Sequence, residues 1–331
     1  MSNQPSLTEP FHIGDVQLDN RVVLAPLAGI GNWFVRLQAR RHGAGLAVSE
    51  MVSSFGLHHR NERTLREMLR LHPDEHPVSI QLFGQDPEVM ASAAGTVAEA
   101  GADIIDINMG CPVKKVRRTG AGASLLGDHE LALEIARGAV EGGRGVPVTV
   151  KVRSGLKTGG REGFDLALRL VDEAGVAAIG FHPRSAQTGH KGTPDYELAR
   201  ELAGSLGAPM IISGGLADAD AARRAYELSG ADAVMIARGS LGNPWIFEEL
   251  TGTRSEPPTE EEAVAELLWV MDRAAEHLGP DRGARYVRKF YPWYLERLGA
   301  PREIAQRLQA TDGIDEAKAV VAGLAPATLP S

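Results

Sequence analysis

The sequence predicts an α/β protein, in which a (β/α)₈ TIM barrel is followed by a small all-α helical domain. Two observations lead to this prediction. Eight short apolar segments recur with helical segments between them, and only helical segments follow about residue 250. The apolar segments are continuous rather than alternating, which is typical of parallel strands buried on both faces. The expected strands are 22–29, 46–50, 78–84, 104–110, 148–155, 178–185, 210–217 and 233–240.

The helices expected between these strands carry recognisable end signals. Asp86 and Pro87 are a typical N-cap and first helical residue for a helix over 86–100, and Gly101 ends it. Strand-then-helix units repeated in this way fit a barrel. A doubly wound sheet is the rival architecture. It would place a GxGxxG motif after the first strand, where residues 28–33 are AGIGNW.

The chain is expected to divide near residue 250. Residues 1–250 form the predicted barrel, 251–260 (TGTRSEPPTE) form a linker, and 261–331 form the helical domain. Within and just before that domain, the apolar pattern predicts helices over 259–278, 282–298, 301–309 and 314–323.

Composition excludes several classes of protein. Of 331 residues, 43% are hydrophobic and 24% are charged, which is ordinary for a soluble globular chain. The one cysteine, Cys111, excludes an intrachain disulfide framework. We expect a cytoplasmic protein with no membrane contact, because neither a signal peptide nor an apolar run of about 18 residues is visible. No metal site is expected, since His and Cys spacings typical of metal ligands are missing.

Polar or glycine residues stand at the end of nearly every expected strand. In a barrel of this type the chemistry lies at the carboxyl ends of the strands. Polar groups there are costly to bury unless they are paired, so their convergence predicts a site. The residues concerned are Pro26–Gly29, Ser49–Glu50, Gln81, Asn108–Cys111, Lys151–Arg153, His182–Arg184, Ser213–Gly215 and Ala237–Gly239.

The seventh and eighth strand ends are rich in glycine, and a short helix over 243–250 is expected behind them. Backbone N–H groups and a helix N-terminus often hold a phosphate at this place in a barrel. Arg238 can add a charge-assisted hydrogen bond. The alternative is that the glycines only make tight turns. Lys151 can lie over an electron-rich ring or a phosphate, or it can form a Schiff base as in barrel aldolases.

Cys111 lies in the loop after the fourth expected strand, just ahead of Lys114, Lys115, Arg117 and Arg118. A lone cysteine is usually a small buried hydrophobe. A thiol beside a basic loop is also a candidate acid or nucleophile. The basic loop itself is either solvated or in contact with an anionic ligand.

A second basic segment lies in the expected helical domain. Residues 282–307 contain seven basic and two acidic side chains, although the whole chain has a net charge of −8. Basic and aromatic residues together are typical of an RNA-contacting helix. The alternative is a helix with an aromatic core face, which we expect to hold about half of these aromatics in either case. The interleaved aromatics are Tyr286, Phe290, Tyr291, Trp293 and Tyr294.

These motifs together resemble the tRNA-dihydrouridine synthases, flavin-dependent reductases with a barrel followed by a helical domain. The resemblance runs in order from residue 11 to about 310, and NMGCP with its downstream GAGASLL is the most specific part. The matching segments are APLAG (25–29) with Arg36, SEM (49–51), IQLFG (80–84), DINMGCPVKKV (106–116), GAGASLL (120–126), VKVRSG (150–155), GFHPRS (180–185), ARGSLGNPWIF (237–247) and RKFYPWYL (288–295).

The resemblance implies FMN-dependent reduction of specific uridines in tRNA to 5,6-dihydrouridine, with NADPH as the electron donor. Cys111 aligns with the catalytic cysteine, which protonates C5 of the uracil while flavin N5 delivers a hydride to C6. Asn108 is implied to face the uracil and the flavin. The implied FMN contacts are Pro26, Leu27, Ala28, Gln81, Lys151 and His182, with the phosphate at Gly214, Gly215, Arg238 and Gly239.

We further predict that Lys114, Arg153, Arg184, Arg285, Arg288 and Lys289 contact the tRNA. The basic segments are expected to form one face that spans the barrel mouth and the helical domain on an otherwise acidic body. The protein is expected to be a monomer, with an oligomer left open.

Two other functions remain open at this point. One is a flavin-dependent barrel reductase acting on a free pyrimidine or another activated alkene, and the basic helical domain argues against it. The other is a tRNA-binding module without catalysis. The presence of Cys111 and Lys151 argues against that second alternative.

Overall fold

The computed structural model describes residues 4–325. Residues 1–3 and 326–331, the outer ends of the two predicted domains, lie outside the described residues. Eight parallel strands form a closed barrel, because the pairing order β4-β3-β11-β10-β9-β8-β7-β6 is completed by pairing between β4 and β6. The barrel strands are β3 (Val22–Leu24), β4 (Leu46–Val48), β6 (Val78–Phe83), β7 (Ile104–Met109), β8 (Val148–Arg153), β9 (Ala178–His182), β10 (Met210–Ser213) and β11 (Ala233–Ile236).

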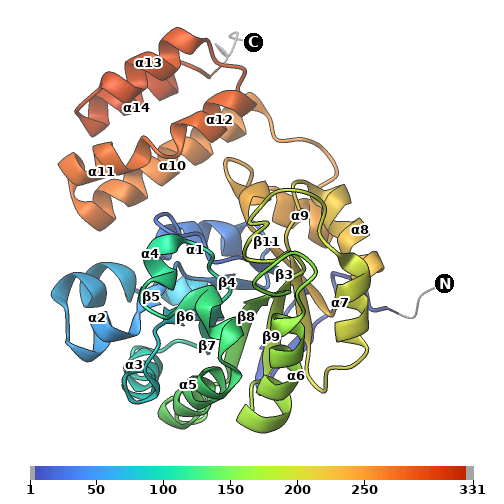
Figure 1. Ribbon diagram of the computed structural model, residues 1–331. Coiled ribbons are helices and arrows are strands. Elements are labelled where there is room, and N and C mark those ends of the chain that lie inside the picture. The colour runs from blue at the N-terminus through green and yellow to red at the C-terminus, as the bar shows by residue number, and fades with distance from the viewer. Residues whose placement is uncertain (1–3, 326–331) are drawn as a thin grey trace.

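Helices surround the barrel (Figure 1), and the predicted TIM-barrel fold is confirmed. Each predicted strand is present but ends between one and five residues early. Of the predicted strand-end residues, Gln81, Asn108–Met109, Lys151–Arg153, His182 and Ser213 lie on the strands, and the others lie in the segments that follow. Asp86, Asp128 and Asp218 cap three of the helices by accepting a backbone N–H. The surrounding helices are α1 (Trp33–Arg41), α3 (Pro87–Glu99), α5 (His129–Gly142), α6 (Glu162–Ala174), α7 (Tyr196–Ala203), α8 (Ala219–Ser229) and α9 (Ile246–Thr251).

Additional elements shape both ends of the barrel. An antiparallel hairpin of β1 (Phe11–Ile13) and β2 (Val16–Leu18), which the sequence pattern did not predict, packs its buried side chains against the first residues of the strands. It therefore closes the amino end of the barrel. At the opposite end, β5 (Val52–Ser53) and α2 (Ser54–His58) follow β4, and α4 (Lys114–Arg117) follows β7. The carboxyl end of the barrel is thus built from these short elements and the loops around them.

The helical group begins with α10 (Glu260–Leu278) and ends with α13 (Arg302–Ala310) and α14 (Ile314–Ala322). The single helix expected over 282–298 was wrong, because the chain forms α11 (Pro280–Val287) and α12 (Tyr291–Arg297) instead. Pro292 lies in the first turn of α12 and has no N–H to continue a helix. The carbonyl of Arg288, between the two helices, accepts a hydrogen bond from Gln309 Nε2 at 3.0 Å.

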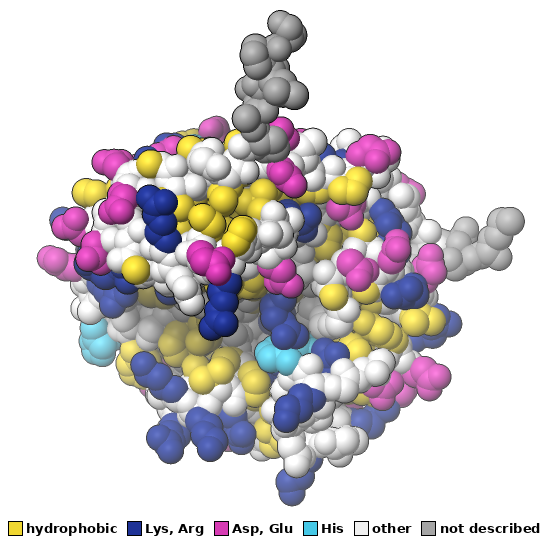
Figure 2. Space-filling view, turned by 90° about the horizontal axis from the view of Figure 1, so that it is seen from above, with side chains coloured by type: hydrophobic (Ala, Val, Ile, Leu, Met, Phe, Trp, Pro, Cys, Tyr) yellow, Lys and Arg dark blue, Asp and Glu magenta, His cyan; other side chains and the backbone are white. Residues whose placement is uncertain are grey.

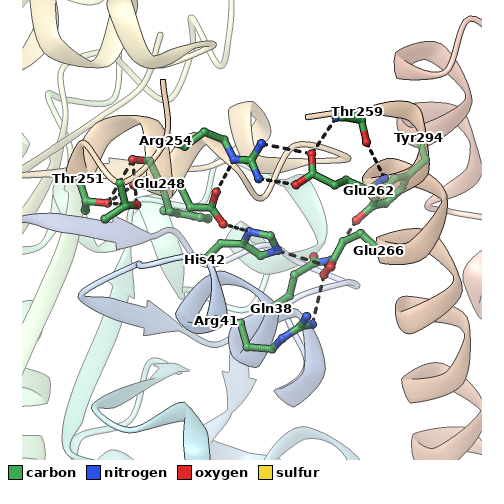
Figure 3. Close-up of polar contacts among 12 residues, drawn as sticks. Gln38, Arg41, His42, Glu248, Thr251, Arg254, Thr259, Glu262, Glu266 and Tyr294 are labelled. Carbon is green, nitrogen blue, oxygen red and sulfur yellow. Dashed lines mark hydrogen bonds and ion pairs between the residues drawn. The ribbon is translucent and has the colours of Figure 1, made fainter. Parts of the chain in front are cut away.

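A polar network fastens the helical group to the barrel (Figure 3). Gln38 of α1 donates to Glu266 of α10 at 2.8 Å. In the segment between α9 and α10, Arg254 contacts both Glu248 and Glu262, at 2.5 and 2.6 Å. Helix α10 is therefore bonded to the barrel helix α1, and the segment between α9 and α10 is bonded to both α9 and α10. This arrangement fixes the helical group beside α1, where Figure 1 shows it above the barrel.

Candidate active site

A cavity of about 630 Å³ opens at the carboxyl ends of the barrel strands. Its size falls within the range of about 300–1,000 Å³ that is typical of ligand sites. Figure 2 shows the hollow from above, with Lys and Arg side chains around it. The predicted site residues that line the cavity are Pro26, Leu27, Ala28, Gln81, Asn108, Cys111, Lys151, Arg153, Arg184, Gly214, Gly215, Arg238 and Gly239.

A directional chain of hydrogen bonds runs from the barrel interior to Cys111. The buried carboxylate of Asp106 accepts from Thr149 Oγ1 and from Gln81 Nε2, both at 2.6 Å. Gln81 Oε1 then accepts from Asn108 Nδ2 at 2.9 Å, and Asn108 Oδ1 accepts the Cys111 N–H at 2.9 Å. Because an ionised carboxylate only accepts hydrogen bonds, it sets the orientation of both amides. Asp106 thereby helps to place the Cys111 backbone.

Two titratable groups have shifted pKa values, and we call them the floor of the cavity: Lys151, which lines it, and Asp106, which is buried beneath it and hydrogen-bonded to Gln81. Burial raises the pKa of Asp106 to about 6, against the hydrogen bonds from Thr149 and Gln81 and the charge of Lys151. Burial, aided by the charge of Arg153, lowers the pKa of Lys151 to about 8. The Lys151 ammonium donates to Ser213 Oγ at 3.1 Å. At neutral pH the floor therefore carries one charge of each sign.

Arg153 and Arg184 line the cavity while also holding the backbone around it. Arg153 donates to the carbonyl oxygens of Gly110 at 3.0 Å and of Gly189 at 2.7 Å. Arg184 donates through Nη2 to the carbonyl oxygen of Gly192 at 2.6 Å. Their residues are only 4% and 8% exposed. Both guanidinium groups thus fix the loop that follows β9, in addition to facing the cavity.

His182 lies behind the cavity wall rather than among its lining residues. A Cβ atom at Gly214 would come within 2.3 Å of the His182 ring, so the glycine allows the ring to approach the wall. Burial, followed by the charge of Lys151, lowers the pKa of His182 far below its usual value. The imidazole is therefore neutral. His190, which the sequence pattern did not single out, does line the cavity.

The loop after β10 forms a glycine cradle. Gly214 and Gly215 have φ angles of +96° and +84°, in the left-handed region that favours glycine. Within residues 4–325 their backbone N–H groups have no hydrogen-bond partner. Arg238 is exposed and lines the same cavity. Adjacent unpaired N–H groups beside a guanidinium are suited to an anion.

The basic segment predicted as a loop forms α4, followed by Arg118, directly after the cavity-lining Val113, and its charges have no ion-pair partner in the described part of the chain. We call Lys114, Lys115, Arg117 and Arg118 the rim cluster. All four side chains are exposed, and none forms an ion pair with another residue in the described part of the chain. Cys111 precedes this cluster in the chain, is partly exposed and lines the cavity.

The basic residues of the helical group are less uniform than the sequence pattern suggested. Arg285 is exposed. Arg288 instead donates to the Thr311 carbonyl at 2.9 Å and to Asp312 at 3.1 Å. Lys289 donates to the carbonyl of Gly29 in the barrel at 3.0 Å. The predicted basic face therefore includes charges that are already engaged within the protein.

The aromatic residues of this segment serve mainly as core. Phe290, Tyr291 and Tyr294 are buried, whereas Tyr286 and Trp293 are half-buried.

None of the helices within residues 4–325 is long and apolar enough to cross a membrane. In the same part of the chain, no three His, Cys, Asp or Glu side chains are arranged to hold a metal ion.

Solved structures of low sequence identity share this fold. Morphinone reductase in complex with tetrahydroNAD has a TM-score of 0.53 and 17% identity, covering 78% of this chain and 94% of that one. A variant of NCR from Zymomonas mobilis has a TM-score of 0.57 and 19% identity, covering 78% of this chain and 95% of that one. At these identities the likeness concerns the fold alone.

Sequence relatives are much more similar. A tRNA-dihydrouridine synthase B from Pseudomonas aeruginosa is 38% identical over 308 residues, covering 91% of this chain and 92% of that protein. One from Shewanella oneidensis is 36% identical over 293 residues, covering 87% and 90%. The model of the dihydrouridine synthase (Dus) family matches residues 23–326. With this match over most of its length, the chain belongs to the dihydrouridine synthase family.

Proposed function

We propose that this protein reduces specific uridines in tRNA to 5,6-dihydrouridine, using FMN as cofactor and NADPH as electron donor. The observation that carries the proposal is the placement of Cys111 in one cavity with Lys151 and the glycine cradle. Family membership and the names of the relatives support it. We place this activity in the cytoplasm and in a monomer, with residues 261–331 as the tRNA-recognition domain.

The residues around the cavity fit FMN. The unpaired N–H groups of Gly214 and Gly215, with Arg238, suit its phosphate. Lys151 on the floor suits an electron-rich ring. When bound and reduced, FMN supplies the hydride that is added to C6 of the uracil. The residues proposed to hold it are Pro26, Leu27, Ala28, Gln81, Lys151, Gly214, Gly215, Arg238 and Gly239, with His182 as support behind Gly214.

Cys111 supplies the proton that completes the reduction. Hydride addition at C6 leaves negative charge conjugated with a uracil carbonyl, and this charge is removed when C5 takes a proton. The Cys111 S–H gives that proton and becomes a thiolate. Lys151 and Arg153 line the same cavity as Cys111. Asn108, which holds the Cys111 N–H, is proposed to face the uracil.

The target uridine must leave its stack to enter the cavity. The rim cluster lies where the neighbouring phosphates of a flipped-out nucleotide would pass, and its exposed charges suit them. Arg285 extends this surface onto the helical group. Arg153 and Arg184 are proposed to face the nucleotide inside the cavity. Arg288 and Lys289 are engaged within the protein, so a contact with tRNA would have to be shared with those partners.

The test combines an activity assay with flavin binding. Purified protein is incubated with FMN, NADPH and an unmodified tRNA transcript, and dihydrouridine is mapped. Cys111→Ala is expected to lower the rate by about 10²-fold or more, while the flavin absorbance of the protein is retained. An undiminished rate in C111A contradicts the role of the thiol. Equal rates on free uracil and on tRNA favour the free-pyrimidine alternative, and flavin-free protein favours the non-catalytic one.

A further inference from the structure

The helical group contacts the barrel at the Gly29 carbonyl, directly after residues that line the proposed cofactor cavity. We propose that Tyr286 and Lys289 are positioning residues for the cofactor, because they hold the Gly29 carbonyl and with it the preceding residues 26–28, which line the cavity. This inference rests on the proposed FMN-dependent function. It assigns Lys289 a different role from the RNA contact that its charge suggests.

Two donors from the helical group converge on the Gly29 carbonyl oxygen. Lys289 Nζ lies 3.0 Å from it, and the Tyr286 hydroxyl lies 3.2 Å from it. The Lys289 ammonium also lies 4.4 Å from the centre of the Tyr286 ring, so the two side chains support each other. Gly29 is therefore held by one neutral and one charged hydrogen bond from outside the barrel.

The direction of the Tyr286 hydrogen bond is set by the barrel. Asn32 caps α1, and its Oδ1 accepts the N–H of Val35. Its Nδ2 therefore faces the Tyr286 hydroxyl and donates to it at 2.6 Å. Because the Tyr286 hydroxyl oxygen accepts this hydrogen bond from Asn32, its own proton is directed to the Gly29 carbonyl.

The other side of Gly29 is held by the barrel itself. Its N–H donates to Glu50 Oε2 at 2.8 Å, and the Glu50 N–H donates to the Gly31 carbonyl at 3.0 Å. Burial raises the pKa of Glu50, while the Gly29 N–H and the charge of Lys289 oppose this rise. Gly29 has a φ angle of +80°, which few other residues adopt readily. Both polar groups of this one residue are thus fixed, one by each part of the molecule.

Fixing the Gly29 carbonyl affects the cavity because the three residues before it form part of the cavity wall. Pro26, Leu27 and Ala28 line the cavity. The N–H groups of Leu27 and Ala28 have no hydrogen-bond partner within residues 4–325. Holding Gly29 on both sides limits rotation of these neighbouring peptides, so their N–H groups keep one direction relative to the cavity. A bound flavin, whose ring edge carries hydrogen-bond acceptors, would benefit from donors that are already oriented.

The experiment compares K289M, Y286F and the double variant with R285M. Arg285 is a suitable control because it is a nearby exposed cation, whereas the side-chain hydrogen bonds to the Gly29 carbonyl come from Tyr286 and Lys289. The dissociation constant of FMN is measured by flavin fluorescence, and the KM for tRNA is measured separately. We expect the double variant to raise the FMN dissociation constant about tenfold and each single variant less. We expect R285M to change it less than about twofold while raising the KM for tRNA.

The outcomes separate this inference from the proposed function. If the wild type binds FMN and the double variant binds it equally well, the positioning role is overturned and the proposed function stands. A wild type that binds no flavin overturns both. An FMN defect shared by R285M also overturns the inference, because it would reflect surface charge. The unfolding temperature of the flavin-free variants checks that each is folded, and Y286F changes only a hydroxyl.

Discussion

The floor and the rim of the cavity both concentrate charge, but in opposite surroundings. On the floor, Asp106 is buried and Lys151 is half-buried, and their pKa values are moved to about 6 and about 8. On the rim, the four side chains of the rim cluster are exposed and without ion pairs within residues 4–325. Floor charges have exchanged water for fixed partners, whereas rim charges remain hydrated and open to screening by salt.

Because of this difference, the floor is best tested by varying pH and the rim by varying ionic strength. Properties that depend on the floor are expected to change with pH between about 5 and 9, because its groups titrate there. Properties that depend on the rim are expected to change with ionic strength, because binding of a polyanion by exposed cations releases counterions. The comparison fails if tRNA affinity depends on the protonation of the floor groups, or if flavin affinity depends on the charges of the rim cluster.

Among the changes that test this comparison, the largest effect is expected from neutralising the rim cluster. The variant K114Q/K115Q/R117Q/R118Q should weaken tRNA binding roughly tenfold or more at low salt. The slope of log Kd against log salt should decrease by about 3, since each phosphate contact contributes about 0.7 to 0.9 to it. Fluorescence anisotropy with labelled tRNA between about 50 and 200 mM salt measures both quantities.

The matched control removes cations that are already paired. Arg282 contacts Glu67 at 2.8 Å and Arg288 contacts Asp312 at 3.1 Å. Because these charges are partly satisfied within the protein, R282Q/R288Q should leave the salt slope nearly unchanged. If the salt slope decreased by as much per removed charge as in the rim variant, the paired and unpaired cations would contribute equally to tRNA binding.

The sequence pattern predicts much of this fold because its signals are local and repeated. Continuous apolar strands, aspartate caps and glycine stops each specify an element without reference to the rest of the chain. The hairpin of β1 and β2 was missed because strands of three residues are too short for a period to be visible. The break between α11 and α12 was missed although Pro292 could have indicated it.

Residues of the candidate site are predictable only in part. Strand ends meet at the barrel mouth by topology, so Cys111, Gln81 and Lys151 were found together. Side-chain direction is not contained in such a pattern. Lys289 has the positive charge expected of an RNA contact, yet its ammonium donates a hydrogen bond to the carbonyl of Gly29. Asp106 was missed because a single acid within an apolar strand does not reveal its partners on neighbouring strands.

The next largest effect is expected from Lys151 on the floor. Its ammonium becomes neutral above a pKa of about 8. If this positive charge supports FMN binding, the dissociation constant of FMN for the wild type should rise above that pH. K151M should bind FMN roughly tenfold more weakly at pH 7 and show little further change up to pH 9. A wild-type dissociation constant that is constant from pH 7 to 9 would remove Lys151 from the proposed cofactor contacts.

The smallest effect concerns Asp106 and the free energy of unfolding. Its folded pKa is raised from 3.8 to about 6, so ionisation is less favourable in the barrel than in the unfolded chain. Its stabilising contribution is therefore greatest at low pH and is lost as pH rises from about 4 to about 6. D106N does not titrate, so its stability relative to the wild type should increase by about 1 kcal/mol between pH 5 and 7.5.

Urea unfolding of both proteins at the two pH values measures this difference. E134Q, at an exposed position on α5, serves as the control, since its surroundings remain aqueous in both states. The comparison between variants cancels the contribution of every other group that titrates alike in both. A stability difference between D106N and the wild type that does not change with pH would mean that Asp106 ionises as easily in the barrel as in water. The pH response of the floor would then rest on Lys151 alone.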